Sequence, residues 1–231
     1  MTMRFDIVLI TTGSRPRLLE QSLRSLRENA TRWAEHSLTL VMDGCSVGAV
    51  CIQAGTAPRR AIVNFADREG ASRSRNIGAS STPAYLRKDA VMFLDDDVYC
   101  CKGWDAFNYK PDAVWSGHAH PFNQPYRVVD SSVPAERTSV ISTVHMIIPW
   151  AIWDAVGPFA EPGGPGGSED VDWCLRAFNR GYTMGVSAPQ SVIHTGLGST
   201  SGSKLIGWEQ VMENNRRLEK VHGVEGKVIY T

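Results

Sequence analysis

The sequence predicts a single α/β domain whose open, mainly parallel sheet is flanked by helices. Apolar runs rich in β-branched residues alternate with amphipathic segments along the first half of the chain, which is the order of βαβ units. These runs are continuously apolar, as strands are when both faces of a parallel sheet are covered. The chain has 231 residues, a length at which α/β folds commonly form one domain.

The first half of the chain carries apolar runs that end in polar residues. The run FDIVLITT is followed by Pro16, which suits the first position of a helix whose leucines fall on one side. The later runs are bounded by turn residues, and a segment with the spacing of a short helix separates two of them. We expect strands at residues 5–12, 38–43, 61–65 and 90–96, and helices from Pro16 and over 71–80.

The second half is less regular. A helical pattern ends at Gly157, and the Gly-Pro-rich residues 161–168 suit neither a helix nor a strand. Another helix is expected to begin near Ser168, because apolar residues recur at helical spacing from Val171 onward. We expect strands near 113–117, 142–148 and 183–188, a strand ending at His194, helices near 150–156 and 207–221, and a loop at 195–203 that could close over a ligand.

Charge and cysteine content exclude several classes of protein. Lys plus Arg and Asp plus Glu both total 24, so no net charge draws the chain to nucleic acid or to an anionic membrane. Five cysteines without a C-x-x-C pair argue against a disulfide scaffold and a zinc finger. No apolar segment has the length of a transmembrane helix or the form of a signal peptide, so we expect a cytoplasmic protein.

The strongest chemical signal is Asp95-Asp96-Asp97, which directly follows the apolar run AVMFL. Three adjacent carboxylates repel one another and lose hydration at the end of a buried strand, so a divalent cation or hydrogen-bond donors should accompany them. Alternate residues of a strand share a face, so Asp95 and Asp97 can serve one ligand while Asp96 points elsewhere. A solvated acidic turn is the alternative interpretation.

Glu169 and Asp170 form a second acidic signal, in the first turn of the helix expected from Ser168. The helix dipole favours carboxylates at this end by about 0.3–1 kcal/mol each, so helix stability alone can explain them. The same field keeps a carboxylate ionised and fixed at the mouth of a site, as a general base requires. Both interpretations stay open from these residues alone.

His194 is the third signal, at the end of a short expected strand. A lone histidine is more often structural than a ligand, and no spacing rule assigns this one. Beside carboxylates and phosphate oxygens, an imidazole suits Mn²⁺ better than Mg²⁺, which prefers shells made only of oxygen.

Six segments follow one another along about residues 5 to 195: IVLITTGSR, LVMDG, GASRSRNIGA, MFLDDDV, GGSEDVDWCLRAFNRGY and VIH. Together they resemble the glycosyltransferases of the GT-A fold, most of all the large family-2 group. The resemblance implies a Rossmann-like sheet, a nucleoside-diphosphate sugar as donor, with a UDP sugar expected, and Mn²⁺ or Mg²⁺ as cofactor. It also implies transfer to an acceptor hydroxyl on a glycan, a protein or a lipid-linked molecule.

The resemblance assigns the acidic motif after the strand to the donor and its metal. Asp95 and Asp97 correspond to the two ends of the family's Asp-x-Asp motif, with Asp95 at the ribose and Asp97 on the metal ion. Asp96 is the intervening position and is assigned to the donor side. His194 corresponds to a downstream histidine that completes the metal shell.

The resemblance also implies the catalytic and remaining binding residues. Asp170 corresponds to the general base of the family's Glu-Asp pair, and Glu169 to its neighbour. The resemblance places Asp43 beside the base of the nucleotide, although Asp43 could be only a turn residue. Arg68 and Arg73 are close enough in sequence to compete with Arg75 for an anionic partner. The donor-binding positions that the resemblance implies are Thr11, Arg15, Asp43, Arg75 and Asn76.

The expected function is therefore that of a metal-dependent glycosyltransferase that inverts the anomeric carbon, with Asp170 as base. Retaining enzymes of the same fold class share the acidic motif, so retention of the anomeric configuration stays open. Two other classes stay open. The start TTGSRPRLL is faintly similar to the entry loop of sugar-1-phosphate nucleotidyltransferases, although it has fewer glycines. A non-catalytic carbohydrate-binding relative could stack sugars on tryptophans such as Trp104 and Trp173.

One domain is expected to hold both halves of such a site. We assign nucleotide binding to about residues 1–97, and the acceptor and catalytic groups to about 98–206. Residues 207–231 are expected to form a C-terminal helix and tail.

Overall fold

The structure is a computed structural model that describes residues 3–45, 60–65, 67–106, 109–117, 138–161, 168–186, 191–195, 208–225 and 228–230. The described strands are β1 (Phe5–Thr11), β2 (Ser37–Met42), β3 (Arg60–Asn64), β4 (Ala90–Asp95), β5 (Val98–Cys100), β6 (Ala113–Ser116), β7 (Thr138–Val140), β8 (His145–Pro149), β9 (Thr183–Val186), β10 (Val192–His194) and β11 (Val228–Tyr230). The described α-helices are α1 (Pro16–Glu28), α2 (Ala71–Ser80), α3 (Trp150–Val156), α4 (Glu169–Phe178) and α6 (Trp208–His222), with 3₁₀ turns at Trp33–Glu35 and Ala84–Leu86.

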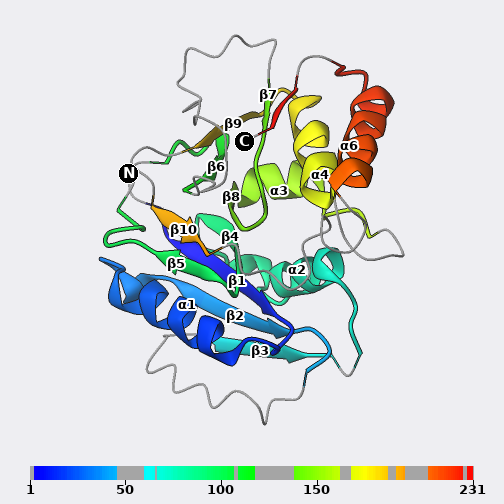
Figure 1. Ribbon diagram of the computed structural model, residues 1–231. Coiled ribbons are helices and arrows are strands. Elements are labelled where there is room, and N and C mark those ends of the chain that lie inside the picture. The colour runs from blue at the N-terminus through cyan, green and yellow to red at the C-terminus, as the bar shows by residue number, and fades with distance from the viewer. Residues whose placement is uncertain are drawn as a thin grey trace.

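A seven-stranded sheet in the order β3-β2-β1-β4-β8-β6-β9 forms the centre of the protein (Figure 1). Strands β3, β2, β1 and β4 are parallel to one another, and β6 is parallel to β9. Strand β8 runs antiparallel to β4 and to β6. The prediction of an α/β protein with a mainly parallel sheet flanked by helices is therefore confirmed.

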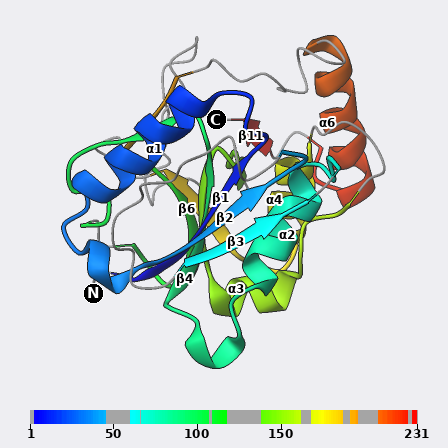
Figure 2. The same ribbon diagram turned by 90° about the horizontal axis from the view of Figure 1, so that it is seen from below.

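Helices cover both faces of this sheet, with α1 on one side and α2 and α3 on the other (Figure 2). The alternation of side chains along β1 divides the core in two. Ile7 and Leu9 pack with Leu19 of α1, whereas Val8 belongs to the cluster that contains Ala79 of α2. These β1 residues are almost fully buried, which explains why the run lacks the apolar-polar alternation of a half-exposed strand.

Helix α2 packs against the sheet at Gly78. A Cβ atom at this position would collide with Val8 and would lie 3.0 Å from Val41 Cγ2. The absence of a side chain therefore lets the helix backbone approach β1 and β2 directly. This contact fixes the distance of α2 from the sheet, and with it the position of Arg75, which lies about one turn earlier on the helix.

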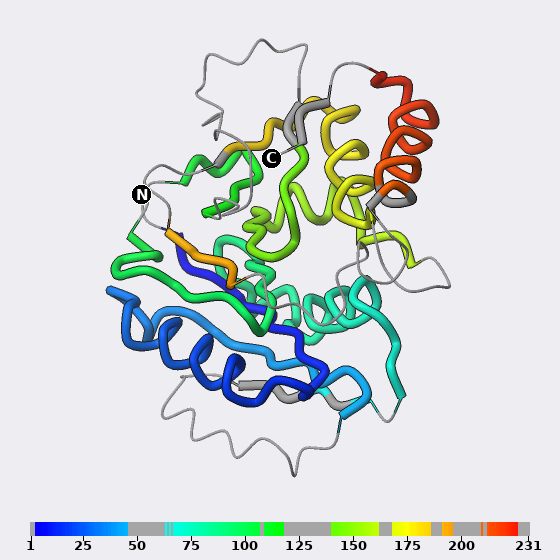
Figure 3. Tube along the Cα trace, in the orientation of Figure 1, coloured from blue at the N-terminus to red at the C-terminus, as the bar shows by residue number. Residues whose placement is uncertain are grey.

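A two-stranded antiparallel ribbon, β5 with β10, brings the end of β10 back to the end of β4 (Figure 3). Within it, His194 pairs with Val98, the residue after Asp97. The backbone N–H and the hydroxyl of Thr195 both donate to the carbonyl oxygen of Asp97, each at 3.0 Å. The ribbon thus fixes the register in which His194 meets the acidic motif.

The short strands are the elements that sequence patterns missed. β5, β7 and β11 have three residues each, and β11 pairs in parallel with β7. The strand expected at 142–148 begins only at His145. The other expected elements form within a few residues of their predicted bounds, although the 161–168 and 195–203 segments lie mostly outside the described residues.

No helix in the described part of the chain is long and apolar enough to cross a lipid bilayer.

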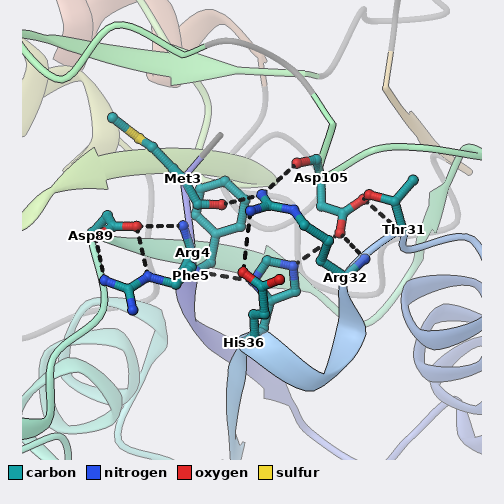
Figure 4. Close-up of polar contacts among 9 residues, drawn as sticks. Met3, Arg4, Phe5, Thr31, Arg32, His36, Asp89 and Asp105 are labelled. Carbon is teal, nitrogen blue, oxygen red and sulfur yellow. Dashed lines mark hydrogen bonds and ion pairs between the residues drawn. The ribbon is translucent and has the colours of Figure 1, made fainter. Parts of the chain in front are cut away.

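A buried polar network anchors the start of β1 to the turn before β2 (Figure 4). Asp105 is fully buried and accepts hydrogen bonds from the backbone N–H groups of Thr31 and Arg32, both at 2.7 Å, and it pairs with His36 Nε2 at 3.1 Å. His36 Nδ1 in turn accepts from the backbone N–H of Phe5 at 3.1 Å. Burial alone would raise the pKa of Asp105, but hydrogen bonds from His36, Thr31 and Arg32 hold it well below its usual value.

Replacing Asp105 should destabilise the protein. We expect Asp105→Ala to lower the free energy of unfolding by about 3 kcal/mol, because buried N–H groups lose their acceptor. Since its pKa is lowered on folding, Asp105 stabilises the fold above about pH 4, and this contribution is lost as the pH falls further. Urea denaturation at pH 7 and in acid measures both effects.

The matched control is Glu20→Ala, which breaks an exposed ion pair with Arg24 and should change the stability by less than about 0.5 kcal/mol. Equal losses for the two variants at pH 7 would contradict the structural role of Asp105.

Candidate functional site

The candidate site lies at the carboxyl end of β4, where ligands bind in open α/β sheets. Strand β1 ends next to it, α4 begins beside it, and the β5–β10 ribbon returns to it. Side chains from these segments form two sets of polar contacts, one around Arg15 and one around Arg75, and the two sets meet at the neighbouring residues Asp95 and Asp96 of the acidic motif. The predicted site residues that these contacts join are Thr11, Arg15, Arg75, Asp95, Asp96, Asp97, Glu169 and His194.

Asp96 points into the protein, toward the end of β1 and the start of α1. Thr11 Oγ1 donates to Asp96 Oδ2 at 2.6 Å, and Arg15 Nη2 donates to Asp96 Oδ1 at 2.5 Å. Burial raises the pKa of Asp96 to about 6, although Thr11 and Arg15 act against this shift. Asp96 therefore holds Arg15 in place, and its contact with a donor remains a prediction.

Asp97 is held between the side chains of Arg15 and His194. Arg15 Nη1 donates to Asp97 Oδ2 at 2.7 Å, and His194 Nε2 lies 3.2 Å from Asp97 Oδ1. Burial alone would raise the pKa of Asp97, but His194 and Arg15 hold it below its usual value. Burial alone would lower the pKa of His194, whereas the hydrogen bond and charge of Asp97 raise it. The two residues predicted as metal ligands are thus in direct contact.

The spacing of Asp97 and His194 fits a shared divalent cation. Neighbouring ligands of an octahedral ion with bonds of about 2.1 Å lie about 3.0 Å apart, close to the 3.2 Å between Oδ1 and Nε2. No group of three His, Cys, Asp or Glu side chains suited to a metal ion occurs among the described residues. Two protein ligands are enough where substrate phosphates and water complete the shell.

Arg75 of α2 joins Asp95 to the start of α4. Its Nη2 donates to Asp95 Oδ1 at 2.8 Å, and its Nη1 donates to Glu169 Oε1 at 3.0 Å. The Arg75 side chain is 4% exposed, whereas that of Asp95 is 27% exposed and reaches solvent. Burial raises the pKa of Asp95, and Asp97 adds to the shift, while Arg75 acts against it. Asp95 is the member of the acidic motif that a ligand can reach most easily.

Asp170 is partly buried in the first turn of α4, beside Glu169. Burial and the charge of Glu169 raise the pKa of Asp170 to about 7, against the opposing effects of Arg75 and of backbone N–H donors. One of those donors is the N–H of Val171, 2.9 Å from Asp170 Oδ1, and another is that of Thr143. A carboxylate with a pKa near neutrality is suited to accept and release a proton.

Asp43 and Asn76 are bound mainly to backbone groups. Asp43 accepts from the N–H groups of Glu69 and Gly70, at 2.6 and 3.2 Å, and so holds the turn before α2. The amide of Asn76 is bonded to the backbone of Phe159, which follows the end of α3. The backbone N–H of Asp43 donates to the carbonyl oxygen of Thr11 at 2.8 Å, but no described contact joins the side chain of Asp43 or of Asn76 to the acidic motif. Their roles at a nucleotide therefore stay predictions.

Sequence reasoning missed Thr143 and Asn215. Thr143 supplies a backbone N–H to Asp170, a contact that any residue type can make and that no motif reveals. Asn215 of α6 accepts a hydrogen bond from Ser168 Oγ at 2.6 Å, directly before the acidic turn of α4. Ser168 itself has φ 76°, in the left-handed region that non-glycine residues rarely occupy.

The tryptophans considered as sugar platforms are core residues. Trp104 and Trp173 are fully buried, and their indole N–H groups donate to the carbonyl oxygens of Leu26 and Gly157. Neither ring presents a face to solvent on which a sugar could stack.

Three solved structures illustrate what the fold resembles. The mannosyltransferase PcManGT from Pyrobaculum calidifontis, in complex with GDP-Man and Mn²⁺, matches 94% of this chain with a TM-score of 0.70 and 14% identity. S. aureus TarS in complex with UDP-GlcNAc matches 96% with a TM-score of 0.69 and 17% identity. GalNAc-T7 with UDP, GalNAc and Mn²⁺ matches 95% with a TM-score of 0.68 and 12% identity.

These likenesses show that the chain has the GT-A fold, as the sequence resemblance implied. The chain covers 64% of the mannosyltransferase, 67% of the TarS structure and 49% of GalNAc-T7. No protein-family model matches the sequence, and no curated protein matches it either.

Removing Arg15 should expose the repulsion within the acidic motif. We expect Arg15→Met to lower the free energy of unfolding by about 3 kcal/mol at pH 8, because two buried carboxylates lose their guanidinium partner. The loss should be smaller at pH 5. Asp96 has a raised pKa of about 6 even with Arg15 present, so it takes up a proton in acid and the repulsion falls.

Urea denaturation at the two pH values tests this expectation, with Arg17→Met as the control on the exposed side of α1. An equal loss at pH 5 and pH 8 would show that charge compensation is not what Arg15 supplies.

Proposed function

We propose that the chain is a metal-dependent glycosyltransferase that moves a sugar from a nucleoside-diphosphate sugar, expected to be a UDP sugar, to an acceptor hydroxyl. The observation that carries the proposal is that two sets of contacts meet at the acidic motif on the carboxyl edge of the sheet. His194 lies beside Asp97 in one set, and Arg75 joins Asp95 to Glu169 in the other. The structural neighbours contain GDP-Man or UDP-GlcNAc, or UDP with GalNAc, and two of them contain Mn²⁺.

The donor is assigned to the first half of the chain. Thr11, Arg15 and Asp43 would lie beside the base, as the sequence resemblance implies. Asp95, the most exposed carboxylate of the acidic motif, would accept hydrogen bonds from the ribose. Asp96 would act through Arg15, because both of its oxygens already accept hydrogen bonds.

The metal ligands would be Asp97 and His194. A divalent cation at this pair would neutralise the charge that develops on the leaving diphosphate. Arg15 already contacts Asp97, and its planar guanidinium can also pair with phosphate oxygens. Asp97 and Arg15 would therefore orient the diphosphate at the end of β4.

Asp170 would remove the proton from the acceptor hydroxyl. The hydroxyl oxygen would then attack the anomeric carbon as the bond from that carbon to the diphosphate oxygen breaks, and the proton would remain on the Asp170 carboxylate. Direct displacement of this kind inverts the anomeric carbon. Glu169 would help to keep the pKa of Asp170 near 7.

A screen of UDP and GDP sugars for Mn²⁺-dependent hydrolysis tests the proposal without knowledge of the acceptor. We expect one donor class to be hydrolysed in the presence of Mn²⁺ and spared after chelation. Asp97→Asn should abolish this metal-dependent turnover. Asp170→Asn should slow transfer to an acceptor by about 10²–10⁴-fold, the range for a general base, while the nucleotide Kd stays close to that of the wild type.

The matched control is Asp172→Asn, which removes the same charge from the same helix but faces Arg176 and His222. If Asp170→Asn transfers as fast as the wild type, Asp170 is not the base. Pyrophosphate release from an NTP and a sugar 1-phosphate would assign the chain to the nucleotidyltransferases instead.

The pH dependence of transfer should report the ionisation of Asp170. The base acts only when deprotonated, so we expect kcat/KM to rise with pH and to level off above about pH 7. Glu169→Gln removes the neighbouring negative charge and should move this rise to lower pH. A profile that is flat from pH 5 to pH 8 would contradict the assignment.

A further inference from the structure

We propose that Arg75 and Asn76 are positioning residues that hold the start of α4 against the donor-binding edge, and that neither is a contact for the nucleotide. The proposal rests on the glycosyl transfer proposed above, because it concerns the placement of Asp170. It departs from the sequence resemblance, which places this Arg-Asn pair near the nucleotide.

The side-chain amide of Asn76 makes its hydrogen bonds to other protein groups. Its Oδ1 accepts from the N–H of Phe159 and its Nδ2 donates to the carbonyl oxygen of Phe159, both at 2.9 Å. Nδ2 also donates to Glu161 Oε1 at 2.8 Å. Both amide hydrogens are therefore used, and the side chain as a whole is buried. A nucleotide could be bound through Nδ2 only if one of these bonds broke.

The guanidinium of Arg75 binds protein carboxylates through its terminal nitrogens, and its Nε is buried. Its two terminal nitrogens bind one carboxylate each, from Asp95 on β4 and from Glu169 on α4. A guanidinium that is almost fully buried is tolerated only with such partners. Since Asp95 belongs to the donor side and Glu169 precedes the base, Arg75 sets the distance between the two parts of the site.

Adjacent residues of α2 thus hold the two ends of the segment between α3 and α4. Asn76 holds the end at Phe159 and Glu161, and Arg75 holds the end at Glu169. Helix α2 is itself fixed to the sheet through the close approach at Gly78. The base is therefore positioned relative to β1, β2 and β4 even though the Gly-Pro-rich sequence around 162–167 favours no regular structure.

Arg75 also contributes to the field at Asp170. Among the described residues, Glu169 and Arg75 are the charged side chains with the largest effects on the pKa of Asp170, and the Cys174 thiol interacts with Asp170 as well. Burial keeps the pKa of Cys174 far above its usual value, so this thiol is uncharged and Arg75 is the cation of the group. Arg75 favours the ionised form of Asp170, and its loss should make the base harder to deprotonate.

Four variants separate positioning from nucleotide binding. Asn76→Ala removes the hydrogen bonds to Phe159. Arg75→Gln removes the guanidinium and its positive charge, whereas Arg75→Lys keeps a positive charge but cannot bind two carboxylates in the geometry of a guanidinium. Arg73→Gln is the control, because this arginine lies on the same helix but pairs with Glu69 on the surface. The measurements are the Kd for UDP with Mn²⁺, kcat at saturating donor, the pH profile, and amide hydrogen exchange in residues 168–178.

We expect Asn76→Ala, Arg75→Gln and Arg75→Lys to lower kcat by at least about 30-fold while the Kd for UDP stays within about fivefold of the wild type. Arg75→Gln should also move the rise of kcat/KM to higher pH by about one unit, a shift that Arg75→Lys should not produce. Asn76→Ala should speed amide exchange at the start of α4, and Arg73→Gln should change none of these quantities.

A weaker Kd for UDP by more than about tenfold with kcat retained would identify nucleotide contacts and overturn the proposal. Amide exchange at the start of α4 that is as slow in Asn76→Ala as in the wild type would overturn it as well. If Arg75→Gln does not fold, Arg75→Lys and Asn76→Ala carry the test. If the wild type turns over no donor, the proposed function fails, and the exchange measurement still decides whether the pair positions α4.

Discussion

The structure of the site depends on the compensation of negative charge at one edge of the sheet. Arg15, directly before α1, and Arg75, on α2, each bind two of the carboxylates at this edge. Without them, the acidic motif at the end of β4 and the acidic turn of α4 would repel each other, because both lie away from bulk water. The carboxylates concerned are Asp95, Asp96, Asp97, Glu169 and Asp170.

This arrangement leaves more negative than positive groups in the network, although the chain as a whole carries no net charge. A divalent cation would therefore weaken the repulsion between these carboxylates and a diphosphate. Asp170 has no ion pair with an arginine among the described contacts, and burial together with the charge of Glu169 raises its pKa to about 7. The placement of the arginines therefore affects both the charge balance of the site and the ionisation of the proposed base.

Elements with a strong apolar pattern could be predicted from the sequence, and partners across the chain could not. Helix α2 has both of its predicted bounds, Ala71 and Ser80, and the strands of the first half lie within two residues of their expected positions. The choice among arginines was open, because Arg73 and Arg75 differ little in sequence context. The structure separates them through burial, since Arg73 is on the surface and Arg75 faces Glu169, 94 residues away. Spacing along a chain contains no information on such pairs.

The left-handed conformation of Ser168 lowers the stability of the protein, whereas the Ser168 hydroxyl helps to hold the start of α4, which carries the proposed base. A left-handed serine costs about 1–3 kcal/mol, so selection for thermal stability alone would favour glycine here. Glycine would relax the backbone and remove the hydroxyl that holds Asn215, which ties α6 to the residue before the acidic turn. A C-terminal helix that contains none of the recognisable motifs therefore limits how far the protein can be stabilised without loosening its proposed base.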